Sequence, residues 1–257
     1  MVRGLGTFKK YFEGFPDNYI IIGGTACDLI INEAGFTPRV TRDIDIILVV
    51  EALSADFVKQ FWKFIQDGHY ERKEKSDDKR KYYRFIKPQQ AEFPFQIELF
   101  ARNPDLIDLD EDAHLTPIPL DDDLTSLSAI LLNDDYYNYL LKNSVLKNSL
   151  NRSRTEALIC LKAKAYLEIA NRISTGSKES SKKLSKHKGD VFRLAVMLAE
   201  DDVFELPLNI KADMQAFAAA IAEDLPATSI FKDMGLSSIS VEKIYNQILK
   251  IFQLNGK

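Results

Sequence analysis

Cysteine and histidine are both scarce in this chain. Of its 257 residues, two are cysteines, Cys27 and Cys160, and three are histidines. Two cysteines cannot build a disulfide scaffold or a cysteine-rich zinc site, and they suit a reducing compartment. His69, His114 and His187 do not have the spacing of metal ligands on one helix, so we expect all three on the surface.

Long apolar runs and an excess of positive charge are also missing. No apolar run approaches the roughly 18 residues of a membrane-spanning helix, and the first residues contain no apolar segment typical of a signal peptide. The net charge is −4 and the pI is near 5.5, which excludes a global positive field for nucleic acid. We therefore expect a soluble, cytoplasmic protein without a membrane partner, in which a local basic face could still hold a tRNA-sized molecule.

The first part of the chain alternates between strand-like and helix-like segments. Short β-branched, aromatic or alternating runs predict strands, and apolar residues at helical spacing predict helices. Strands are expected at 19–22, 43–50, 70–75, 81–87 and 93–100, and helices at 25–33 and 54–67. Thr25 and Asp28 have the spacing of a capping box at the start of the first helix.

Beyond about residue 116 the pattern predicts helices alone. Helical spacing is found at 123–133, 155–172, 189–200, 210–223 and 240–253, with no convincing strand between these segments. The serine- and lysine-rich stretch 174–186 predicts a mobile loop. The sequence therefore predicts an α+β protein, with an α/β domain at 1–115 and a helical domain at 116–257.

A glycine pair separates the first predicted strand from the first predicted helix. Gly23 and Gly24 lack Cβ atoms, so the backbone there can approach a ligand closely. The helix that starts at Thr25 directs free N–H groups and its positive dipole end to the same place, which suits triphosphate oxygens. Taken alone, the glycines are explained more simply by a tight turn with no ligand.

The next predicted strand carries two acidic residues spaced by one. Asp43 and Asp45 point to the same face, because side chains alternate along a strand. Two adjacent carboxylates repel one another unless a cation lies between them, and Mg²⁺ prefers carboxylate, phosphate and water oxygens. Taken alone, the pair is explained more simply as solvated residues. Together with the glycines about 20 residues earlier, it indicates a site for metal ions and phosphates.

Three further residues are candidates for such a site. Glu98 lies within the apolar strand 93–100, where an unpaired charge is costly. It can face the same metals if this strand pairs beside Asp43–Val50, or it can lie on an exposed face of the sheet. Lys162 lies on the apolar stripe of its helix, so it either extends its amine to water or contacts an anion. Asp190 lies on the packing edge of another helix, where it is equally explained as an N-cap.

These motifs resemble the nucleotidyltransferase superfamily, which shares its fold with polymerase β. Within it, the AbiEii-type branch is most similar, including nucleotidyltransferase toxins of toxin–antitoxin systems. The similar segments are Gly23–Ala26, Arg42–Asp45, Leu161–Tyr166 and Lys188–Leu194. Gly189, which separates Lys188 from Asp190, and Arg193, at a position where the family often has an acid, depart from the pattern.

The resemblance implies a polymerase β-like mixed sheet followed by an all-α lobe. It also implies a site with two Mg²⁺ ions and a nucleoside triphosphate. The residues that would bind the nucleotide are Gly23, Gly24, Thr25, Arg42 and Lys162. The metal ligands would be Asp43, Asp45 and Glu98, and the catalytic set would be Asp43, Asp45, Glu98, Lys162 and Asp190.

The expected function is Mg²⁺-dependent transfer of a nucleoside monophosphate to an acceptor hydroxyl. The toxin-like resemblance favours an RNA 3′-end, such as that of tRNA, or a protein as acceptor, and implies a cognate antitoxin as partner. Small-molecule acceptors, as used by antibiotic-modifying enzymes of the same fold, remain open. The rival interpretation is a catalytically silent module that binds nucleotide or protein. A nucleic-acid-binding protein without chemistry is a further rival, which the acidic pI disfavours.

Overall fold

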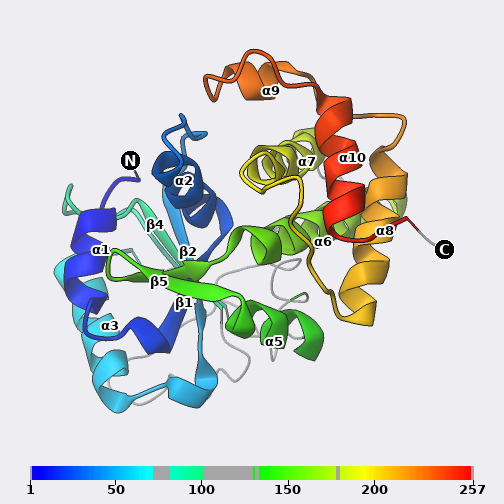
Figure 1. Cartoon of the computed structure of the whole chain (residues 1–257). Helices are drawn as coiled ribbons and strands as arrows, with labels where there is room; N and C mark the ends of the chain where they lie inside the picture. The colour runs from blue at the N-terminus through cyan, green and yellow to red at the C-terminus, as the bar shows by residue number, and fades with distance from the viewer. Residues whose placement is uncertain (1, 72–81, 101–129, 131–132, 178–179, 256–257) are drawn as a thin grey trace. The chain divides into compact units, whose positions relative to one another are not determined.

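The computed structural model describes residues 2–71, 82–100, 130, 133–177 and 180–255 (Figure 1). These residues form two compact units. The first contains the described parts of 1–28, 40–124 and 144–153, and the second those of 29–39, 125–143 and 154–257. The predicted domain boundary near residue 115 lies outside the described residues and stays a prediction.

A mixed sheet forms the first unit, which confirms the α+β fold class. Within the described residues its strands lie in the order β3-β4-β2-β1-β6-β5. β2 is antiparallel to β1 and parallel to β4, while β1 is parallel to β6. The strand bounds are Tyr19–Ile22 for β1, Asp43–Leu48 for β2, Tyr82–Ile86 for β3, Gln96–Phe100 for β4, Ser144–Lys147 for β5 and Leu150–Ser153 for β6.

The hairpin of β5 and β6 corrects the expectation of helices alone beyond residue 116. Leu150–Ser153 pairs with β1 through Arg152 and Ile21, and so extends the sheet of the first unit. The hairpin escaped sequence analysis because its strands are short and polar, with few β-branched or aromatic residues. Asn148 and Ser149 both have positive φ angles, as a two-residue turn between antiparallel strands requires.

Aromatic side chains fill the core between the sheet and the helices α1 (Leu5–Phe12) and α3 (Ala55–Asp67). These two helices pack together beside the sheet, as the blue and cyan ribbons in Figure 1 show. Phe8 contacts Phe12, Tyr19 and Phe64 within 6 Å between ring centroids. Burial of such large rings is the main source of stability for a unit of this kind.

α3 confirms the helix predicted at 54–67, including its start. The Ser54 hydroxyl accepts a hydrogen bond from the Phe57 backbone N–H at 3.2 Å, so Ser54 is the N-cap of the helix. α2 (Gly23–Glu33) starts two residues earlier than predicted, and its Thr25 lies inside the first turn. The capping box of Thr25 and Asp28 is therefore wrong.

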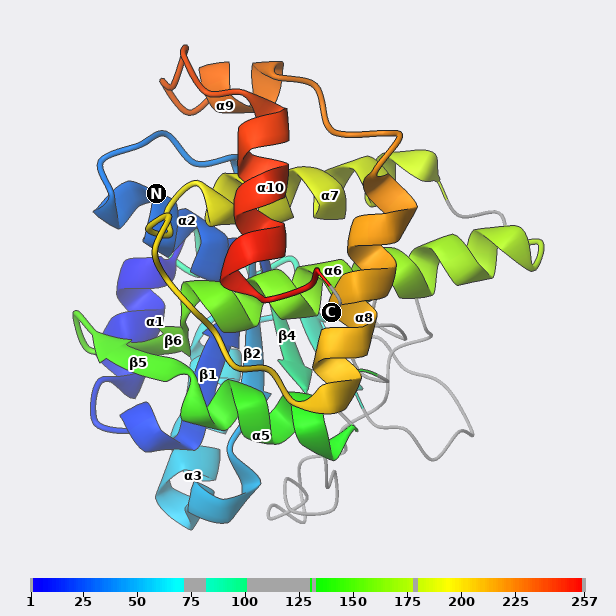
Figure 2. The ribbon, with the colours of Figure 1, turned by 45° about the vertical axis from the view of Figure 1, so that its right-hand side comes forward.

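The second unit consists mainly of helices that pack around α6 (Thr155–Ser174). α6 is buried along most of its length, and it contacts α7 (Ser181–Ala195) and α8 (Leu208–Ile221). α10 (Val241–Ile251) packs on α7, which the rotated view of Figure 2 shows clearly. The remaining described helices of the unit are α5 (Asp134–Lys142) and the short α9 (Ser229–Lys232).

α7 differs from its prediction because it begins earlier. Its first two turns cover the last part of the stretch that was predicted as a loop, from Ser181 onward, and Ser180 caps the helix by accepting a hydrogen bond from the Lys182 N–H. Asp190 consequently lies inside the helix, so the N-cap interpretation of this residue is wrong. The helix predicted at 123–133 falls mostly outside the described residues. Among those that are described, no helix has both the length and the apolarity to span a bilayer.

Candidate functional site

The pairing of β2 with β4 brings the predicted carboxylates side by side. Asp45 lies opposite Glu98 in the parallel register, and Asp43 lies opposite Gln96. Ile44 and Ile46 are buried, whereas both aspartates are partly exposed, so alternation places Asp43 and Asp45 on the same face. The condition under which Glu98 could join the two aspartates, adjacent pairing of their strands, is therefore met.

Gly23 makes room for the Asp45 carboxylate at the start of α2. Its φ angle is +64°, a left-handed conformation that glycine adopts without strain. A Cβ atom at this position would lie 1.7 Å from Asp45 Oδ2. A Cβ atom on Gly24 would lie 2.5 Å from the Thr41 hydroxyl oxygen. The glycines thus allow close packing of the chain around Asp45 at the start of α2.

Thr25 and Arg42 have different surroundings although both were predicted to bind nucleotide. Thr25 is fully buried, and its hydroxyl donates a 2.5 Å hydrogen bond to the backbone carbonyl of Asp43. That bond joins α2 to the first residue of β2, so only the backbone N–H of Thr25 could meet a phosphate. Arg42 is exposed beside Asp43 and could reach an external anion.

Glu98 has two partners that the sequence analysis did not identify. Arg84 of β3 contacts Glu98 Oε1 through Nη2 at 2.7 Å and through Nε at 2.9 Å. The side-chain amide of Gln96 donates to the same oxygen at 2.6 Å. The antiparallel register of β3 with β4, which places Arg84 opposite Glu98, is a property of the sheet that no local pattern reveals.

The environment of Glu98 also changes its acidity. Burial and the neighbouring Asp45 carboxylate raise the pKa of Glu98 to about 8, against the opposing effect of the Arg84 guanidinium. Two carboxylates in contact cannot both ionise cheaply unless a cation joins them. Glu98 therefore has the properties of a carboxyl group that either keeps its proton beside Asp45 or binds a metal ion.

The carboxylates of this site suit a hard divalent cation, although the described residues do not supply a complete set of ligands. Among the described residues there is no cluster of three or more His, Cys, Asp or Glu that could hold a metal ion. Mg²⁺ commonly uses one or two protein carboxylates and takes its other ligands from water and substrate phosphates. The carboxylates of Asp43 and Asp45, which share one face of β2, fit that mode of binding.

In the second unit, Lys162 and Asp190 form a buried ion pair. Lys162 Nζ lies 3.1 Å from Asp190 Oδ2, and the two side chains are 7% and 3% exposed. Lys162 is buried because it lies on the same face of α6 as the buried Leu158 and Ala165. Although burial alone would raise the pKa of Asp190, the Lys162 ammonium and the Arg39 guanidinium hold it below its usual range.

Three other residues around Asp190 were missed by the sequence analysis. Arg39 Nε and Arg193 Nη1 lie 3.5 Å and 3.4 Å from Asp190 Oδ1. His187, which we expected on the surface, is half-buried, and its Nδ1 is buried with no hydrogen-bond partner among the described residues. Burial and the nearby Lys162 and Lys186 lower the pKa of His187 to about 3, so the imidazole is neutral at pH 7.

Some of this cluster could have been found from the sequence. Arg193 lies three residues after Asp190, a spacing at which helical side chains meet, and Gly189 leaves space where a Cβ atom would lie 3.0 Å from the Arg193 guanidinium. The two departures from the family pattern are therefore neighbours in the structure. Arg39 carried no such signal, because it lies outside any predicted element.

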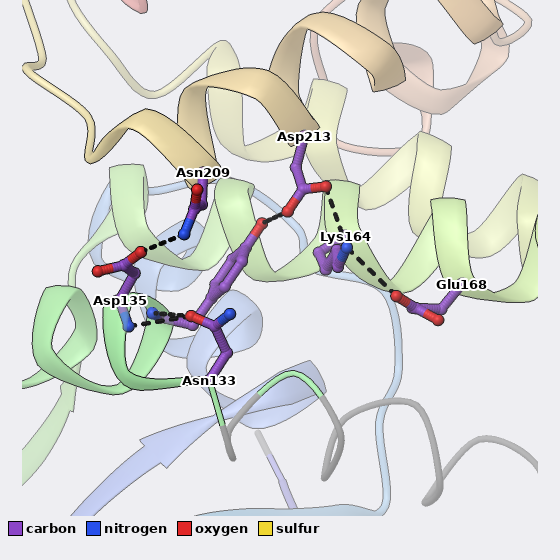
Figure 3. Close-up of polar contacts among 7 residues, drawn as sticks. Asn133, Asp135, Lys164, Glu168, Asn209 and Asp213 are labelled. Carbon is purple, nitrogen blue, oxygen red and sulfur yellow. Dashed lines mark hydrogen bonds and ion pairs between the residues drawn. The ribbon is translucent and has the colours of Figure 1, made fainter.

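Lys164, two residues after Lys162, has a different set of partners. Figure 3 shows its side chain directed to Glu168 of the same helix and to Asp213 of α8. The Lys164 Nζ distances are 3.2 Å to Glu168 and 3.0 Å to Asp213, which also accepts from the hydroxyl of Tyr136 at 2.9 Å. These contacts join α5, α6 and α8.

The candidate residues thus form two groups, one in each compact unit. Gly23, Gly24, Asp43, Asp45 and Glu98 surround the start of α2 and the adjacent strands. Lys162 and Asp190 lie together on α6 and α7.

Comparison with known proteins adds little to this description. The sequence matches no protein-family model and no curated protein sequence. Among solved structures, the chain is similar to an antigenic nucleotidyltransferase-like protein from Paracoccidioides brasiliensis, with 13% sequence identity and a TM-score of 0.43. The similarity covers 88% of this chain and 94% of that one. A likeness of this degree carries no argument about activity, and the AbiEii-type resemblance depends on the sequence motifs alone.

Proposed function

We propose that this protein is a Mg²⁺-dependent nucleotidyltransferase. The observation that carries the proposal is the arrangement around Asp45. This carboxylate lies beside Glu98 in the sheet, and it packs against Gly23, where the backbone of α2 begins. A pair of adjoining carboxylates at the start of a helix, where the first N–H groups have no partner within the helix, is suited to a ligand that is both metal-bound and anionic.

The protein's own groups have defined tasks in this proposal. The backbone N–H groups of Gly23, Gly24 and Thr25, and the positive end of the α2 dipole, would bind phosphate oxygens. Arg42 and Lys162 would add positive charge to the nucleotide site, and Asp190 would orient Lys162. Glu98 would orient the acceptor hydroxyl.

Asp43, Asp45 and Glu98 would hold Mg²⁺, in a site of two ions as the resemblance implies. When bound, the metal supplies charge neutralisation at the phosphates. The acceptor hydroxyl loses its proton to water, and its oxygen forms a bond to the α-phosphorus. The bond between the α-phosphorus and the oxygen that bridges to the β-phosphate breaks, and pyrophosphate leaves. Catalysis in this scheme comes chiefly from positioning and from electrostatic stabilisation by preorganised groups.

The acceptor class in this proposal follows the toxin-like resemblance. An RNA 3′-end, such as that of a tRNA, or a protein hydroxyl is preferred, and a cognate antitoxin would be the natural regulator. A small-molecule acceptor of the antibiotic type is the alternative within the same chemistry.

A second candidate function is a catalytically silent module that binds nucleotide or protein. Two observations favour it. Glu98 already has a cationic partner in Arg84, and the described residues contain no cluster of three metal-ligating side chains. In this case the carboxylates would stabilise the sheet and the turn at Gly23 without taking part in a reaction.

The experiment incubates the purified chain with Mg²⁺ and each labelled nucleoside triphosphate in turn, with total RNA, with a protein extract or with small hydroxyl compounds. We expect transfer of label to an acceptor by the native chain and none by Asp43→Ala. Asp56→Ala removes an exposed carboxylate of α3 and serves as the matched control. Absence both of transfer and of Mg²⁺-dependent nucleotide binding would sink the proposal. Nucleotide binding without transfer would support the silent module, and RNA affinity independent of Mg²⁺ would indicate binding without chemistry.

A further inference from the structure

Arg84 lies in one row with the acidic residues of the sheet. It is opposite Glu98 in the antiparallel pairing of β3 with β4, and Glu98 is opposite Asp45 in the parallel pairing of β4 with β2. Residues opposite one another on adjacent strands interact through their side chains when they share a face. The row therefore runs from a cation on β3 through Glu98 to the Asp45 carboxylate at Gly23.

Arg84 and Gln96 both donate to the same oxygen of Glu98. Nη2 and Nε of Arg84 lie 2.7 Å and 2.9 Å from Oε1, and the Gln96 amide adds a third donor to the same atom at 2.6 Å. Oε2 receives none of these bonds. Three donors on one oxygen fix the carboxylate plane, and the second oxygen is then the one that Glu98 offers to another ligand.

The ion pair of Arg84 and Glu98 is largely shielded from solvent. The Arg84 and Glu98 side chains are 16% and 13% exposed. Ion pairs on an open surface are mobile and contribute little, whereas a shielded contact made through two guanidinium nitrogens has a defined direction. Lysine could keep the charge at position 84, but it could not reproduce two N–H donors in a fixed plane.

We propose that Arg84, together with Gln96, is a positioning residue that holds Glu98 so that its Oε2 is presented on the side of Asp45. The inference rests on the proposed nucleotidyl transfer, since Glu98 is the group through which Arg84 acts. Arg84 itself touches neither the nucleotide nor the metal. Loss of a residue that contacts a metal ligand, but not the metal itself, typically lowers metal affinity or activity by about 10–100-fold.

The test is a double-variant cycle on the full chain. It compares the native protein with Arg84→Met, Glu98→Gln and the double variant. Lys63→Met, which removes an exposed cation from α3, is the control for charge and size. Two quantities are measured for each protein: the dissociation constant of Mn²⁺ without nucleotide, by electron paramagnetic resonance of the free ion, and kcat and KM for label transfer. Thermal unfolding shows that each variant is folded, and Arg84→Lys provides a milder change at the same position.

We expect Arg84→Met to weaken Mn²⁺ binding and to lower kcat by about 10–100-fold, with KM for the nucleotide near its native value. The same substitution should have no further effect when Glu98 is already glutamine, because Arg84 acts through that carboxylate. Arg84→Lys should lie between the native chain and Arg84→Met. If the ion pair were purely structural, Arg84→Met would lower the unfolding midpoint, but its effects on Mn²⁺ binding and kcat would not depend on Glu98.

Additive effects in the double variant, or an Arg84→Met protein indistinguishable from Lys63→Met, would overturn the inference. Failure of the proposed function has a different signature. If the native chain transfers no label to any acceptor, the Mn²⁺ dissociation constants of the four proteins still test the role of Arg84. Coupled effects of the Arg84 and Glu98 substitutions on Mn²⁺ binding would support that role, and independent effects would contradict it. A native chain that binds no Mn²⁺ overturns the inference together with the metal site.

Discussion

Gly23 illustrates how a single residue can determine the geometry of a site. Two independent observations explain why glycine is needed at this position. Its φ is +64°, and an added Cβ atom would lie only 1.7 Å from Asp45 Oδ2. Gly23→Ala should destabilise the protein by at least about 1–2 kcal/mol from the backbone conformation alone. Displacement of Asp45 should in addition abolish nucleotide transfer. Urea denaturation and the transfer assay measure the two effects.

The control for this prediction is Gly6→Ala. Gly6 lies on the exposed side of α1, and a Cβ atom there would meet no other atom within 4 Å. Alanine is the better helix former, so this variant should be as stable as the native chain or slightly more stable. If Gly23→Ala behaves like Gly6→Ala, the packing of Asp45 against the glycine is not needed for folding or function.

The raised pKa of Glu98 leads to a prediction about pH. The folded-state value is about 8 and the unfolded value is 4.5, so between these pH values the folded state binds more protons than the unfolded state. The contribution of Glu98 to stability is therefore greatest below about pH 4.5, and it declines as the pH rises towards 8. In buffers without divalent ions, the free energy of unfolding of the native chain should fall relative to Glu98→Gln between pH 5 and pH 8. A difference that is constant or that grows with pH would contradict the assignment.

At the scale of an element, α6 carries two lysines with different predicted roles. Lys162 is paired with Asp190, and Lys164 joins Asp213 and Glu168 in the contacts of Figure 3. Burial alone would lower the pKa of Lys164, but Asp213 and Glu168 raise it, so this lysine stays charged at any ordinary pH.

Lys162→Met should lower nucleotide transfer by about 100-fold or more, because it removes a charge from the proposed nucleotide site. It should also lower stability, because Asp190 stays buried without its lysine partner. Lys164→Met should leave transfer near its native rate and cost about 1–2 kcal/mol of stability through the lost contacts with Asp213. Transfer rates and urea denaturation of the two variants, which differ only in position on one helix, separate the roles. Equal loss of transfer in both would remove the distinction between them.

At the scale of the whole molecule, a ligand that binds only the folded protein must stabilise it. A non-hydrolysable nucleoside triphosphate with Mg²⁺ at about 100 times its dissociation constant should add about 2.7 kcal/mol to the free energy of unfolding. Asp45→Asn, which weakens the proposed metal site, should lose most of this increment, whereas nucleotide without Mg²⁺ should give little. A thermal shift that is the same in Asp45→Asn and in the native chain would show that the ligand binds elsewhere.

Most elements could be predicted because their signals are local. The apolar run before Gly23, the alternation around Asp45 and the helical spacing in α3 each depend on neighbours in the sequence. The predictions that were wrong also have physical explanations. The β5–β6 hairpin is too polar to be recognised as strands, and α7 starts within a lysine- and serine-rich stretch because Ser180 caps it and its later turns pack in the core.

By itself, the sequence determined the α+β character of the chain, the glycine turn before α2 and the shared face of Asp43 and Asp45, since alternation and helical periodicity are properties of the local backbone. Only the tertiary structure decided which strands are neighbours. The β2–β4 and β3–β4 registers place Asp45, Glu98 and Arg84 in one row, and tertiary packing brings Arg39 and Lys162 to Asp190. Such contacts depend on how distant segments bury their apolar faces together, so no local pattern contains them.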